Sequence, residues 1–113
     1  MAYDEALADR IRELIAGESG VTEQRMFGGL AFLVDGHMAV AAGGQGGVLI
    51  RIDPDKSATL IASGKAEPME MRGRQLKGWL RVEAAGLRTK RQLATWVDRG
   101  VSSARSLPPK PAR

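Results

Sequence analysis

Hydrophobic and polar residues repeat along this chain with two different periods, and each period predicts a different element. In residues 3–16 the apolar side chains recur every three or four positions, which is the spacing of one face of an α-helix. Residues 25–40 instead hold two strand-favouring apolar runs on either side of Asp35-Gly36. These two residue types tolerate the positive φ angles of a type I′ turn, so residues 25–40 predict the β-hairpin around which we expect the sheet to form.

Two glycines follow the start of this hairpin, at Gly28-Gly29. Glycine inside a strand has no side chain to pack, and it marks a bulge or a place where another backbone or a ligand comes close. We interpret the pair as a bulge that bends the strand over the first helix, with a ligand site as the alternative. Gly17 is predicted to end the first helix in a left-handed conformation.

The second half of the chain predicts three more strands and two helices. The strands are expected at residues 48–52, 68–72 and 79–83, and a basic loop bounded by Gly73 and Gly78 separates the last two. Asp53-Pro54-Asp55 is typical of a helix start, and Gly64 of its end. The predicted fold is α+β, with the order α-β-β-β-α-β-β-α and a mainly antiparallel five-stranded sheet. The chain is expected to form one domain over residues 1–107, followed by a flexible proline-rich tail at 108–113.

The last helix has the clearest start signal, because Thr89 and Gln92 fit a capping box. Its predicted buried stripe is Leu93, Trp96, Val97, Val101 and Ala104. Lys90 and Arg91 occupy the first turn, where the helix dipole disfavours cations. This mismatch indicates either an anionic partner for these two cations or an ordinary surface position at which the residue type has drifted.

Charge is divided unevenly along the 113 residues. The first 70 carry 11 carboxylates and 6 cations, whereas the remaining 43 carry 2 carboxylates and 11 cations. A basic segment attracts nucleic acid or an acidic protein, although such a segment is more often a solvated face. The candidate interaction surface is Arg72, Arg74, Lys77, Arg81, Lys90 and Arg91.

Catalytic and metal-binding patterns are missing from the sequence. The chain has no cysteine and a single histidine, His37, which we expect at a solvent-facing strand end. No nucleophile-elbow, metal-binding-helix or dinucleotide pattern occurs, and the glycines at 43–47 precede a strand instead of the helix that a phosphate loop requires. We therefore expect no enzyme activity, no cofactor and no metal. The N-terminus lacks a signal-peptide pattern and no apolar run reaches the ~20 residues of a membrane span, so a cytoplasmic protein is expected.

Several motifs in the same order resemble the N-terminal domain of the TfoX/Sxy family. They are residues 25–32 (RMFGGLAF), 35–38 (DGHM), 71–74 (MRGR) and 78–80 (GWL). The signature residues, mainly structural, are Arg25, Met26, Phe27, Gly28, Gly29, Gly36, Gly73 and Trp79. The resemblance implies a two-layer α/β sandwich similar to secretion-chaperone-like folds, which often pair as dimers. Family regulators carry a second, helical domain after this one. This sequence has only one helix and a proline-rich tail after its last predicted strand, so we expect a stand-alone single-domain member.

The resemblance implies a role close to that of competence regulators, which work with a cyclic-AMP-responsive activator at promoters. The leading hypothesis is a non-enzymatic regulatory or protein-interaction module with a protein partner in transcription. Weakly specific DNA binding through the basic residues is the second hypothesis, and a small-ligand or enzymatic site near Gly28-Gly29 is the third. A homodimer is expected because a five-stranded sheet has an edge to cover.

Overall fold

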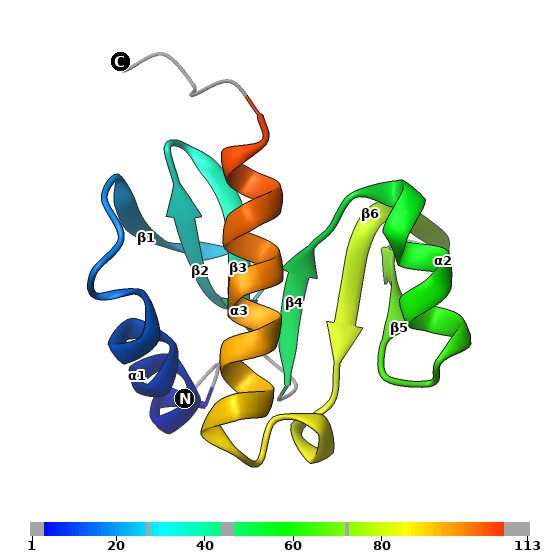
Figure 1. Cartoon of the computed structure of the whole chain (residues 1–113), viewed down its shortest axis with the longest axis horizontal. Helices are drawn as coiled ribbons and strands as arrows, with labels where there is room; N and C mark the ends of the chain where they lie inside the picture. Colours follow the sequence, from blue (N-terminus) through cyan, green and yellow to red (C-terminus); the bar gives the residue numbers. More distant parts are fainter. Residues whose placement is uncertain (1–3, 27, 44–46, 72, 108–113) are drawn as a thin grey trace.

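The computed structural model describes residues 4–26, 28–43, 47–71 and 73–107, and these form three helices packed on one side of an antiparallel sheet (Figure 1). The elements in chain order are α1 (Glu5–Ile15), β1 (Val21–Met26), β2 (Gly29–Val34), β3 (His37–Ala42), β4 (Val48–Arg51), α2 (Pro54–Ala62), β5 (Glu67–Met71), β6 (Arg74–Val82), the 3-10 turn η1 (Ala84–Gly86) and α3 (Lys90–Arg105). The strand order is β1-β2-β3-β4-β6-β5. In the described residues, no helix has the length and apolar character needed to cross a membrane.

The α+β class and the antiparallel sheet are confirmed, but the predicted number of five strands is wrong. The sixth strand is β1, which begins at Val21, before the hairpin predicted at residues 25–40. β1 pairs with β2 along its whole length, from Val21 opposite Val34 to Met26 opposite Gly29. Its four middle residues are exposed, so it lacks the apolar alternation by which strands are recognised.

The predicted turn of the central hairpin is confirmed, while the predicted bulge is not where we expected it. Asp35 and Gly36 have φ angles of 52° and 87°, the positive values that a type I′ turn requires. Gly28, with φ of 72°, lies instead in the turn between β1 and β2. Gly29 begins β2, and a Cβ there would collide with the carbonyl oxygen of Ala42. The glycine pair therefore allows a turn and a close backbone approach.

The bulge of the hairpin is at Ala39, on the returning strand. Phe32 pairs with Val40 and Leu33 with Met38, so Ala39 is an extra residue in β3. As a result Ala39 and Val40, although consecutive, both lie in the core cluster on the helix side. The carbonyl of Ala39 lies against Gly100 of α3, where a Cβ would collide with the oxygen.

Helix α3 forms as the capping box predicts, and it provides most of the cover for the sheet. Thr89 Oγ1 accepts from the Gln92 amide at 3.0 Å, and Gln92 Oε1 accepts from the Thr89 amide at 3.0 Å. All five predicted stripe residues are buried, together with Gly100. Sequence periodicity missed Gly100 because glycine carries no hydrophobic signal.

Helix α1 is shorter than predicted, and Arg10 in its middle attaches it to the segment before α3. It begins after the cap Asp4, and Tyr3 lies outside the described residues. Arg10 donates to the Leu87 carbonyl at 2.8 Å. The helix ends at Ala16 in right-handed geometry, so the left-handed end predicted at Gly17 is wrong; the left-handed glycine is Gly20, with φ of 74°.

Two arginines on helices form ion pairs with carboxylates of other segments. Arg12 forms a bidentate pair with Glu23, with nitrogen-to-oxygen distances of 2.7 and 2.8 Å, and so joins α1 to the edge strand β1. Arg105, at the end of α3, contacts Glu18 at 3.2 Å and Asp35 at 3.5 Å. The last turn of α3 is thereby attached to both the α1–β1 loop and the β2–β3 turn.

Helix α2 and the β5–β6 hairpin form the other flank of the molecule. Asp53 caps α2 by accepting from the Asp55 amide at 3.0 Å, and Gly64 follows its end with φ of 77°, as predicted. No residue of α2 is buried. The basic loop predicted between Gly73 and Gly78 is wrong, because β6 already begins at Arg74. The sequence did not predict a strand at Arg74 to Lys77, because these residues are mostly polar and show no apolar alternation.

Replacing Gly100 with alanine should destabilise the protein. Alanine favours a helix by about 1 kcal/mol over glycine, but the new methyl group would push α3 away from the Ala39 carbonyl. Overpacking of this kind costs about 1–3 kcal/mol, so we expect a lower midpoint in urea unfolding. The control is Gly17→Ala, where nothing lies within 4 Å of the added atom. Equal stability of the two variants would contradict the close-packing account.

The Arg12–Glu23 pair should make stability depend on pH. The Arg12 guanidinium holds the pKa of Glu23 below its usual value, mainly through their hydrogen bonds. A lowered pKa stabilises the fold above about pH 4.3, the ordinary value, and this contribution is lost as the pH falls through the folded-state pKa. Thermal unfolding of Glu23→Gln should therefore show a lower midpoint than wild type at pH 7 and the same midpoint at pH 2. The control Glu13→Gln, at an exposed position without an ion pair in the described residues, should match wild type at both.

Candidate interaction surfaces

The side of the sheet opposite the helices carries its own apolar cluster. We call it the open face: Ala31, Met38 and Ala41 are buried there, and Met26, Leu33, Leu49 and Trp79 are packed around them and partly buried. The separate main core contains every buried hydrophobic residue of the helices. The open face arises because β2 and β3 are apolar at successive positions, and successive side chains point to opposite faces.

Cations border the open face on one side. Arg51 lies over the ring of Trp79, with the guanidinium carbon 5.3 Å from the ring centroid. Arg81 is paired across the ladder with Leu49 and contacts Glu67 at 3.9 Å and Glu83 at 3.6 Å. An apolar centre with a polar rim is the composition of a protein–protein interface.

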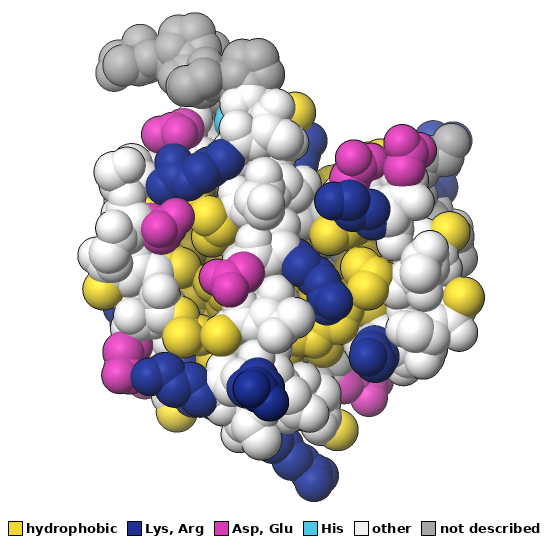
Figure 2. All heavy atoms as spheres, viewed as in Figure 1, with side chains coloured by type: hydrophobic (Ala, Val, Ile, Leu, Met, Phe, Trp, Pro, Cys, Tyr) yellow, Lys and Arg dark blue, Asp and Glu magenta, His cyan; other side chains and the backbone are white. Residues whose placement is uncertain are grey.

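A groove runs along the helix side between α3 and α2. Figure 2 shows it as a hollow with an apolar floor, flanked by basic side chains. It consists of two cavities of about 530 and 600 Å³, and Arg99 lines both. It exists because α2 packs on β6 while α3 packs on β3 and β4, so the helices leave a strip of the sheet between them.

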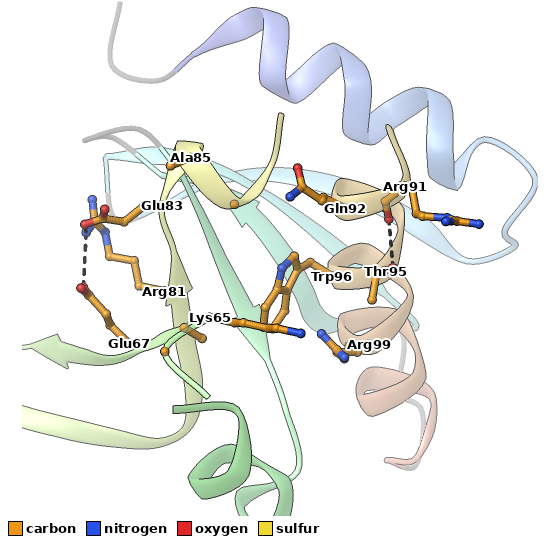
Figure 3. Close-up of a pocket in the computed structure, with 13 residues that line it drawn as sticks. Lys65, Glu67, Arg81, Glu83, Ala85, Arg91, Gln92, Thr95, Trp96 and Arg99 are labelled. Atoms are coloured by element: carbon orange, nitrogen blue, oxygen red, sulfur yellow. Dashed lines mark hydrogen bonds and ion pairs between the residues drawn. The ribbon is translucent and has the colours of Figure 1, made fainter. Parts of the chain in front are cut away.

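The smaller cavity, which we call the basic cavity, lies beside the first half of α3. Trp96 forms part of its floor and is only 5% exposed, and the Arg99 guanidinium carbon lies 4.6 Å from the centroid of the Trp96 ring. Figure 3 shows Lys65 and Arg99 extending toward one another beside Trp96, while Arg91 extends away from the cavity. Arg81, Glu67 and Glu83 also line the basic cavity, but Figure 3 shows their side chains grouped together away from Trp96.

The larger cavity has a different charge. Its lining includes the carboxylates of Asp53, Asp55 and Asp98 and the cations of Lys56 and Arg99. The groove is therefore more basic at one end and more acidic at the other. Among the described residues, no cluster of three or more histidine, aspartate or glutamate side chains could hold a metal ion.

The structure places the predicted interaction residues on several parts of the molecule. Arg81 and Arg91 line the basic cavity, whereas Lys90 lies beside Arg10 and Leu93 at the α1 side of α3. Arg74 begins β6, at the opposite end of that strand from Arg81. Arg72 lies outside the described residues, and so does the side chain of Lys77.

Sequence reasoning missed Lys65, Trp96 and Arg99 as a group. Trp96 was expected only to pack in the core. One signal was available for the others: Arg91, Thr95 and Arg99 are four residues apart and so share one face of the helix. Of the signature residues, Gly28, Gly36 and Gly73 have positive φ angles, Gly29 allows a close backbone approach, and Trp79 lies on the open face. Arg25 and Met26 end β1, and Phe27 lies outside the described residues. His37 begins β3 and is half-buried.

Comparison with protein-family models gives one match, described as the TfoX N-terminal domain, over residues 13–104. The matched segment contains the last three residues of α1, the whole sheet, α2, and α3 except its final residue, Arg105. No curated protein matches the chain.

Proposed function

Since the chain belongs to the TfoX N-terminal domain family, we propose that it is a non-enzymatic regulatory module that acts by binding another protein, in a role related to competence or transcription. The family match supports the regulatory part of the proposal. The open face supports the protein-binding part, and it is the observation that carries the proposal.

The argument from the open face rests on the ordinary behaviour of antiparallel sheets. A sheet with one solvated face usually alternates apolar residues toward the core with polar residues toward water. Leu33 and Leu49, on neighbouring parts of the open face, break this alternation. Large contiguous apolar patches on a soluble chain mark interaction sites, so the open face is the surface we assign to the partner.

A second copy of the chain is one partner that this surface would accept. The sheet has two edges, β1 and β5, and exposed edges favour pairing with another chain. A homodimer and a complex with a transcription protein would both cover the open face. The mass of the complex distinguishes the two.

Crosslinking from the open face tests the proposal. A photoreactive residue at Gln24, which pairs with Ala31, should give a defined protein adduct in the native cell, and mass spectrometry of the adduct distinguishes a second copy from another protein. The control position is Glu13, exposed on α1, which should give none. Leu49→Lys should abolish the Gln24 adduct while circular dichroism stays unchanged. Equal labelling at Gln24 and Glu13 would refute the assignment of this face.

Direct DNA binding is a second candidate, favoured by a basic cluster at the start of α3. Arg88, Lys90 and Arg91 are exposed and lie within four consecutive residues. Three phosphate contacts would weaken duplex binding about 40-fold between 50 and 200 mM salt, by the release of counterions.

Fluorescence anisotropy with a 20-base-pair duplex measures this directly. Lys90→Gln should reduce the slope of log affinity against log salt by about 0.9, whereas Lys56→Gln, on α2, should leave it unchanged. The absence of binding at 50 mM salt would eliminate this candidate.

A further inference from the structure

We propose that the basic cavity binds a small organic anion, in which a phosphate or carboxylate group is attached to a flat apolar group. This site is separate from the open face and does not depend on the protein-binding proposal. Lys65 and Arg99 would hold the anionic group, and the apolar floor beside Trp96 would receive the rest of the ligand.

The first step of the argument is the arrangement of charge. Lys65 and Arg99 extend toward one another (Figure 3), and in the described part of the chain neither has a carboxylate within ion-pair distance. Arg12, Arg81 and Arg105, in contrast, each contact two carboxylates. Two cations directed at a common space repel each other unless an anion lies between them.

Neighbouring carboxylates do not supply that anion. Glu67 and Glu83 also line the basic cavity, but the side chains of both contact Arg81, which borders the open face. Asp53, Asp55 and Asp98 line the adjoining cavity, not this one. A negatively charged ligand is therefore attracted to the end of the groove where Lys65 and Arg99 meet.

The second step is the geometry of Arg99. Its guanidinium lies 4.6 Å from the centroid of the Trp96 ring, and a guanidinium above an aromatic face keeps its N–H groups available at its edge. Such a fork matches the two oxygens of a carboxylate or phosphate, which it binds through paired charge-assisted hydrogen bonds. Contact with Trp96 reduces the conformational freedom that Arg99 would lose on binding.

The third step is the size and the lining of the cavity. Its volume of about 530 Å³ lies within the ~300–1,000 Å³ range of small-molecule sites. Ala66, Ala85 and Gly86 join Trp96 in the lining and offer apolar contact. Gln92 adds one more donor, because its Oε1 accepts from the Thr89 amide while its side-chain nitrogen has no hydrogen bond in the described residues.

Phenyl phosphate is a suitable probe, because it joins the two required groups. We expect titration of ¹⁵N-labelled protein to shift the backbone amide signals of residues 65, 66, 96 and 99 in a saturable way. Lys65→Gln and Arg99→Gln should each weaken binding roughly tenfold or more, since each removes a charge-assisted hydrogen bond. The control Lys56→Gln removes an exposed lysine of the same groove outside the basic cavity and should change affinity less than twofold.

Three further results bear on the proposal. Inorganic phosphate should bind more weakly than phenyl phosphate, and equal affinity would overturn the apolar part of the site. Benzoate binding at the same residues would support a carboxylate ligand, and benzyl alcohol should not bind. The absence of saturable shifts at 10 mM phenyl phosphate, equal losses in Lys65→Gln and Lys56→Gln, or binding only of a 20-base-pair duplex would overturn the proposal. Lys65 is exposed, so its variant keeps the test valid even where Arg99→Gln disturbs the packing of Trp96.

Discussion

The contact between Gly100 of α3 and the Ala39 carbonyl of β3 determines how the two layers of this protein fit together. A helix normally lies on a sheet at a distance set by the side chains between them. Here a glycine meets a backbone oxygen directly, so at this point α3 approaches the sheet more closely than a larger residue would allow. The bulge at Ala39 accompanies this contact: Ala39 lies in the core cluster on the helix side, and its carbonyl lies against Gly100. Close packing of this kind fixes position more strictly than general hydrophobicity does.

Both surfaces of interest follow from that placement. Because α3 covers β3 and β4 at close range and α2 covers β6, the strip between the helices remains as the groove. Because α1 also packs against α3 on the same side, the helices leave the opposite side of β2, β3 and β4 without helical cover. The open face and the groove are thus two results of placing all three helices in one layer.

The sequence was sufficient to predict the elements whose signals are local. Asp35-Gly36 specified its turn, Asp53-Pro54 the start of α2, and Thr89 with Gln92 the start of α3, because each signal lies within a few residues. β1 was missed because an exposed edge strand needs no apolar alternation. The bulge was assigned to Gly28-Gly29 instead of Ala39 because the pairing register depends on the partner strand, which local sequence does not reveal.

The candidate sites were harder to predict for the same reason. Lys65 and Arg99 are 34 positions apart, and only the fold brings them to one cavity. Leu33 and Leu49 looked like ordinary strand residues, since an apolar run does not show which of its side chains will face a helix. The charge count identified the basic part of the chain correctly, but it could not distinguish Arg81, which contacts two carboxylates, from Arg99, which contacts none in the described residues.

The absence of buried residues in α2 has a consequence for the groove. Local opening costs least where few apolar side chains are buried, and the α2 residues that pack on the core, Leu60 and Ile61, are only partly buried, so opening of α2 should cost less than opening of α3. The groove accordingly has one rigid wall, formed by α3, and one compliant wall, formed by α2. Its width can adapt to an occupant at a small cost in free energy, while the position of Trp96 and Arg99 on the rigid wall stays constant.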